Sequence, residues 1–124
     1  MNKDYQLGLL YLVHLLMSAD GVVDENETQA LSSIKIKEGI PDSIFNEFTK
    51  AIAEKKGREI YQTGIEYMNK CSDEEKLRAF VFLYKMSEAD GRVHVKEVRL
   101  LLYCIKVSGI EFDDVVAKAS ISSI

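Results

Sequence analysis

Proline, paired cysteines and long hydrophobic runs are scarce in this chain. It has one proline in 124 residues, and no stretch alternates apolar and polar residues for long enough to indicate a strand. Only two cysteines occur, Cys71 and Cys104, without CxxC spacing or a nearby histidine, so the sequence contains no zinc signature. Both lie in helix-like stretches. We therefore expect buried free thiols rather than a disulfide, which fits a reducing, cytoplasmic location.

A basic stripe is also missing. The net charge is −4, and the longest basic cluster is the short run at residues 55–58. Nucleic-acid binding surfaces carry clustered Lys and Arg, so this function class is not expected. No apolar stretch reaches the roughly 18 residues that a transmembrane helix needs. We expect no membrane span, while peripheral association with a membrane complex stays open.

Motifs of catalysis are absent as well. No serine or cysteine has a recognisable base partner, and no glycine-rich loop could hold a phosphate. The sequence therefore predicts a protein that is not an enzyme.

The apolar stretch at 7–17 resembles a signal peptide, but Asp4 and His14 interrupt that pattern. A similar stretch at 77–86 lies well inside the chain, so we interpret both as core helices.

The chain contains one short phrase twice. Ala-Asp-Gly-x-Val-x-x-x-Glu occurs at 19–27 and again at 89–97, an offset of 70 residues. Apolar helical stretches flank both copies. Glycine permits the left-handed backbone of a tight turn, so each copy is interpreted as the loop of a helix–loop–helix hairpin. The pairs of helices around the two loops span about 5–38 and 75–108.

Helical periodicity predicts an all-α fold. The expected helices are about 4–18, 24–38, 41–56, 72–86, 94–107 and 112–119, with a further helix that includes Ile60 to Met68. Ser72 and Glu75 form a capping box, and Gly39 and Gly109 end two helices. Gly64 predicts a close helix crossing, and the nearly all-apolar helix that follows Ser72 is the candidate central helix. We expect residues 1–124 to form one compact bundle of about seven helices, with the two hairpins related by a pseudo-twofold axis.

The repeated loops carry acids suited to a hard cation. If the pseudo-twofold axis brings the copies together, Asp20, Glu27, Asp90 and Glu97 would converge and offer oxygen ligands to Ca²⁺, Mg²⁺ or Mn²⁺. Asp24 adds a further carboxylate to the first copy. The second copy is diluted by basic residues at 92 and 96 and by a histidine at 94, so the first should attract cations more strongly.

Two other interpretations compete with this site. A regular EF-hand fails, because its first ligand position would fall on Leu16 in one copy and Met86 in the other. In the second alternative, Glu27 and Glu97 only cap the free N–H groups at the starts of their helices. The chain would then be a small helical protein–protein interaction module.

The duplicated phrase resembles the tellurite-resistance TerB-like family. The resemblance rests on Ala19, Asp20, Gly21, Val23 and Glu27 and on their counterparts Ala89, Asp90, Gly91, Val93 and Glu97. It implies an all-helical domain proposed to chelate metal through acidic residues, with links to tellurite resistance and stress responses in bacteria. The implied ligands are Asp20, Glu27, Asp90 and Glu97. A protein partner is also expected.

Overall fold

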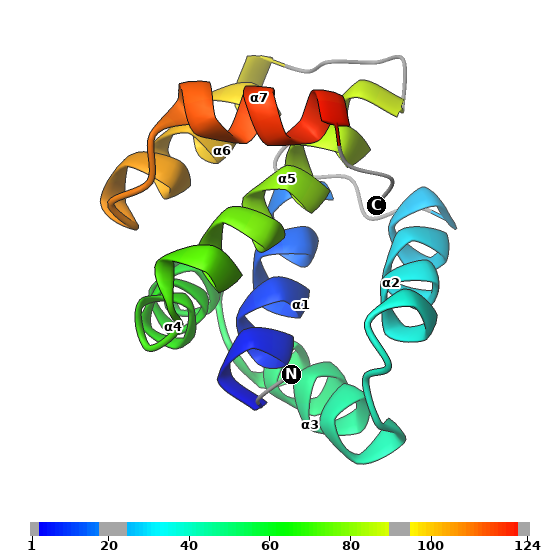
Figure 1. Ribbon diagram of the computed structural model, residues 1–124. Helices are drawn as coiled ribbons and strands as arrows, with labels where there is room; N and C mark the ends of the chain where they lie inside the picture. The colour runs from blue at the N-terminus through cyan, green and yellow to red at the C-terminus, as the bar shows by residue number, and fades with distance from the viewer. Residues whose placement is uncertain (1–2, 18–24, 90–94, 122–124) are drawn as a thin grey trace.

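The computed structural model describes residues 3–17, 25–89 and 95–121, with the side chains at 17, 25–28, 30, 86–89 and 95–98 excluded. These residues form helices and connecting turns without a strand, which confirms the predicted all-α fold (Figure 1). The helices are α1 (Lys3–Met17), α2 (Glu25–Lys37), α3 (Asp42–Glu54), α4 (Gly57–Asn69), α5 (Asp73–Ala89), α6 (Val95–Val107) and α7 (Phe112–Ile121).

Two helices end in the same glycine turn. Gly39 follows α2 with φ of 62°, and Gly109 follows α6 with φ of 77°. The Ile40 N–H donates to the Lys35 carbonyl at 2.9 Å, and the Ile110 N–H donates to the Ile105 carbonyl at 3.2 Å. This six-to-one hydrogen bond is the Schellman motif, in which glycine takes the left-handed conformation without steric cost. The predicted helix stops at both glycines are confirmed.

The repeat includes a third helix. α1 and α5 begin 70 residues apart (3 and 73), as do α2 and α6 (25 and 95) and α3 and α7 (42 and 112). The repeating unit is therefore three helices, α1–α3 and α5–α7, with α4 inserted between them. Both α3 and α7 were expected as helices, but the repeated phrase did not identify them as members of the repeat. Their sequences share little beyond the Gly-Ile turn that precedes each.

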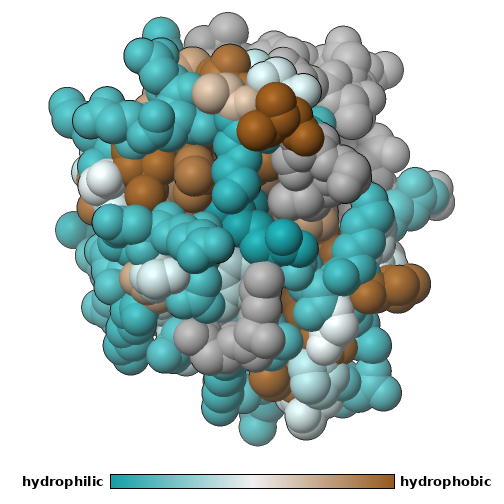
Figure 2. Space-filling view, viewed as in Figure 1, coloured by the Kyte–Doolittle hydropathy of each residue, from teal (hydrophilic) through white to brown (hydrophobic). Residues whose placement is uncertain are grey.

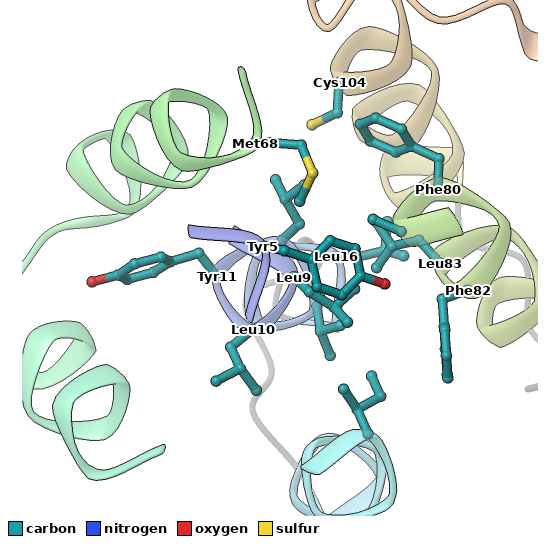
Figure 3. Packing of buried hydrophobic residues seen from close by; sticks show 14 of the residues in the cluster. Tyr5, Leu9, Leu10, Tyr11, Leu16, Met68, Phe80, Phe82, Leu83 and Cys104 are labelled. Atoms are coloured by element: carbon teal, nitrogen blue, oxygen red, sulfur yellow. The ribbon is translucent and has the colours of Figure 1, made fainter. Parts of the chain in front are cut away.

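The central helix is α1, so the prediction that the helix after Ser72 is central was wrong. α1 packs against α2, α3, α4, α5 and α6, whereas α5 packs mainly against α1, α6 and α7. Every residue from Tyr5 to Val13 is buried. Figure 3 shows α1 surrounded by side chains from its neighbours, including Met68 of α4, Leu83 of α5 and Cys104 of α6. The first turn of α5 is acidic and exposed, which keeps that end of the helix at the surface.

The face of the molecule in Figure 2 is mainly hydrophilic, with apolar groups showing between the polar side chains. None of the helices in the described ranges is long and apolar enough to cross a membrane. Cys71 and Cys104 are buried free thiols, as predicted.

Two glycines allow α1 and α4 to cross closely. A Cβ at Gly64 of α4 would lie 3.0 Å from the Tyr11 Cβ of α1. A Cβ at Gly8 of α1 would lie 2.9 Å from the Met68 Cε and 3.3 Å from the Met68 backbone nitrogen. The predicted crossing at Gly64 is confirmed, while its partner Gly8 was not predicted. The crossing brings the two backbones nearer than any larger residues would permit.

Gly64→Ala should destabilise the fold despite the better helix propensity of alanine. The added methyl meets a Cβ that cannot rotate away, at an overpacking cost of about 1–3 kcal/mol. The propensity gain is only about 1 kcal/mol. We expect a net loss of up to about 2 kcal/mol in the free energy of unfolding, measured by urea denaturation.

Gly57→Ala is the matched control in the same helix. A Cβ at Gly57 has no atom within 4 Å among the described residues, so this variant should unfold at or above the wild-type urea concentration. Equal stability of the Gly64 and Gly57 variants would contradict the close crossing.

Candidate functional site

The two acidic phrases lie between helices that are described on both sides. The first lies between α1, which ends at Met17, and α2, which starts at Glu25; the second lies between α5, which ends at Ala89, and α6, which starts at Val95. Asp20, Asp24 and Asp90 lie outside the described residues. The backbones of Glu27 and Glu97 lie in helices, and their side chains are outside the described set.

Glu27 and Glu97 hold equivalent places in the fold. Each is the third residue of a helix of 13 residues, α2 or α6. The first turn of a helix has N–H groups without intrahelical acceptors, so a carboxylate here is favoured as a cap and by the helix dipole. In Figure 1, α1 and α5 end and α2 and α6 begin in the upper half of the view. These positions of the helix ends are compatible with both interpretations, in which Glu27 and Glu97 are either cation ligands or helix caps.

A capping box within the described residues shows how a glutamate of this chain can cap the start of a helix. The Ser72 N–H donates to Glu75 Oε1 at 3.1 Å, and the Glu75 N–H donates to Ser72 Oγ at 3.1 Å. This reciprocal pair at the start of α5 confirms the predicted capping box. Asp24 and Glu27 have the same three-residue spacing in the sequence.

The described side chains contain no alternative metal site. No group of three or more His, Cys, Asp or Glu among them is arranged to hold an ion. An open pocket of about 390 Å³ between the starts of α5 and α7 is lined by four acids and Lys118; the acids are Asp73, Glu74, Glu111 and Asp114. His14 packs against Phe48 with ring centroids 6.2 Å apart, as expected for a packed histidine.

A buried ion pair joins the two repeats. Glu38, just after α2, accepts hydrogen bonds from Arg78 of α5 at 3.2 Å from Nε and 3.4 Å from Nη2. The Tyr5 hydroxyl of α1 donates to the same carboxylate at 3.4 Å. The Glu38 side chain is 3% exposed and that of Arg78 is 36% exposed. The hydrogen bond and charge of Glu38 raise the pKa of Arg78 against the opposing effect of desolvation.

Sequence reasoning missed this ion pair, although one signal was present. A carboxylate at the C-terminal end of a helix is unfavourable, because the helix dipole is negative there. Glu38 directly precedes the glycine that ends α2 and therefore requires a compensating cation. Its partner is 40 residues away, beyond the reach of local patterns.

Arg78→Met should destabilise the protein more than Glu38→Gln. The first change leaves a buried carboxylate with the Tyr5 hydroxyl but without its cation, at a cost of up to about 3–5 kcal/mol, whereas Arg78 is partly exposed and can turn to water.

Urea denaturation at neutral pH tests the pair, and the double variant completes a double-mutant cycle with the two single changes. Glu38→Gln/Arg78→Met should be more stable than Arg78→Met alone, by a coupling energy of about 1–3 kcal/mol. Strict additivity of the two single changes would contradict the interaction.

The comparisons with known proteins identify a family. The model described as "Tellurite resistance protein TerB" matches residues 6–118, from α1 into α7. No curated protein and no solved structure matches the chain significantly. The family match covers most of the 124 residues and includes both copies of the repeated phrase. This chain belongs to the TerB tellurite resistance family.

Proposed function

We propose that this TerB domain binds a divalent cation through its paired acidic loops and does not catalyse a reaction. The proposed ligands are Asp20, Asp24, Glu27, Asp90 and Glu97, and the proposed ion is Ca²⁺, Mg²⁺ or Mn²⁺. The setting we propose is the bacterial cytoplasm, in a tellurite or stress response, with a protein partner. We also propose that the whole chain forms one domain.

The observation that carries this proposal is the register of the repeat. α2 and α6 end 70 residues apart, at Lys37 and Val107, in the same glycine turn, so Glu27 and Glu97 occupy equivalent positions in equivalent helices. Independent capping would need only an acid near each helix start. Retention of Asp-Gly-x-Val-x-x-x-Glu at both places is what a composite site of four carboxylates would require.

Charge favours the first loop as the stronger half. Residues 18–27 include four acids and no base, whereas residues 88–97 include Arg92, His94 and Lys96. A hard cation gains most where carboxylates are not already neutralised by nearby cations. The carboxylates of α2 and its preceding loop should therefore contribute most of the affinity.

A second function, a protein interaction module without a metal, has one observation in its favour. Ser72 and Glu75 show that this chain uses a glutamate three residues after a cap to bond the start of a helix. Asp24 and Glu27 could do the same at α2, and Glu97 would then bond the free N–H groups of α6. In that case the loop acids stabilise helices only.

Thermal unfolding with added ion separates the two functions. A ligand that binds only the native state stabilises it by about 2.7 kcal/mol at about 100-fold excess over Kd. We expect millimolar Ca²⁺, Mg²⁺ or Mn²⁺ to raise Tm by several degrees in the wild type. Asp20→Asn and Glu27→Gln should each remove most of this rise, because each deletes an anionic ligand.

Glu75→Gln is the matched control, since Glu75 caps a helix outside the acidic loops. It should lower Tm slightly and leave the ion-induced rise intact. A wild-type Tm that none of the three ions changes would refute the cation site. Glu27→Gln would then be expected to behave as Glu75→Gln does.

A further inference from the structure

The outer face of α6 combines apolar and cationic residues. Its exposed positions recur at helical spacing and are Arg99, Leu102, Tyr103, Lys106 and Val107, here called the α6 face. Leu102 is 41%, Tyr103 55% and Val107 38% exposed. The opposite side of the helix, with Leu101, Cys104 and Ile105, is buried in the core. The apolar residues of the α6 face are therefore additional to those that hold the helix in place.

The other repeat shows that the fold does not require apolar residues here. The equivalent positions of α2, 70 residues earlier, are exposed in the same register and are Gln29, Ser32, Ser33, Ile36 and Lys37. Two serines thus occupy the positions that Leu102 and Tyr103 take in α6. These positions are exposed in both repeats but differ in chemistry, so the shared backbone plan does not require apolar residues at 102 and 103.

Tyr103 is held in place by a neighbouring helix. Its ring stacks on Tyr61 of α4, with centroids 5.8 Å apart and an interplanar angle of 28°. An aromatic side chain that is fixed before binding loses little conformational entropy when a partner covers it. Half-exposed tyrosines of this kind are frequent anchors in protein interfaces.

The cations of the α6 face are available to a partner. Arg99 and Lys106 are two helical turns apart, about 10.5 Å along the axis. Within the described side chains neither forms an ion pair. No acid lies among the exposed positions of this face, although the whole chain carries a net charge of −4. The face is a local cationic and apolar surface on an acidic protein.

We propose that the α6 face docks an amphipathic helix of a partner protein, whose short apolar stripe is flanked by Asp or Glu residues about two turns apart. The apolar stripe would cover Leu102, Tyr103 and Val107, and the acids would pair with Arg99 and Lys106. The proposal does not depend on cation binding.

Charge and shape exclude two other occupants. A second copy in symmetric contact would place cation against cation, in either parallel or antiparallel pairing of the α6 faces. A helix that lies on a bilayer buries its main apolar face in the lipid, whereas the main apolar face of α6 is turned into the core. The narrow apolar stripe that stays exposed on α6 has the width of the contact between two packed helices.

The test uses a synthetic helical peptide of about 18 residues with a leucine stripe and glutamates seven positions apart. Binding is followed by NMR amide shifts of the labelled protein and by fluorescence anisotropy of the peptide. The shifts should map to α6 and Tyr61. A peptide with lysines in place of the glutamates should bind at least about tenfold more weakly.

Two variants locate the site. Leu102→Ser/Tyr103→Ser installs the α2 residues and should weaken glutamate-peptide binding by about tenfold or more. Arg99→Glu/Lys106→Glu keeps the apolar side chains and should reverse the preference, so that the lysine peptide binds better. Ser32→Leu/Ser33→Tyr changes the equivalent positions of α2 and should leave binding to α6 unaltered.

Three outcomes would overturn the proposal. The glutamate peptide fails to bind at millimolar concentration, or it binds the Leu102→Ser/Tyr103→Ser variant as well as the wild type. In the third outcome, vesicles of anionic phosphatidylglycerol bind the wild type but not the Leu102→Ser/Tyr103→Ser variant, and the peptide binds neither protein. That result would assign the α6 face to a membrane surface.

Discussion

The arrangement of the molecule depends on the close crossing of α1 and α4. Gly8 and Gly64 remove the two side chains that would hold these helices apart. α4 can then cover one side of α1, leaving its other sides to α2, α3, α5 and α6. A helix covered on so many sides must be apolar around most of its circumference, and α1 is buried continuously from Tyr5 to Val13.

Around this crossing, the two repeats share a backbone plan and differ in chemistry. Position 38 carries the glutamate that pairs with Arg78, whereas position 108 of the second repeat is a buried serine. The outer faces of α2 and α6 differ in the same way. The shared helix boundaries define a common architecture, and the differences between the repeats include the Glu38–Arg78 ion pair and the α6 face proposed to dock a partner.

Local features of the sequence predicted much of the fold. Periodicity located the helices to within a few residues, Ser72 and Glu75 identified a cap, and Gly39 and Gly109 identified helix ends. Contacts between distant residues were not predictable in this way. The Glu38–Arg78 pair and the central place of α1 both depend on packing that no short window contains. For the candidate cation site the sequence indicates the residue types, and convergence of Asp20 and Glu27 with Asp90 and Glu97 stays a prediction.

The buried cysteines limit what sulfur chemistry the folded chain can do. Burial raises the pKa of the Cys71 thiol to about 11 and that of the Cys104 thiol to about 12. The thiolate is the form that attacks electrophiles and oxidants, so both sulfurs are almost fully protonated, and poorly nucleophilic, near neutral pH. These are the only cysteines of the chain. Burial therefore disfavours reduction of a tellurium oxyanion by the two thiols of the folded chain.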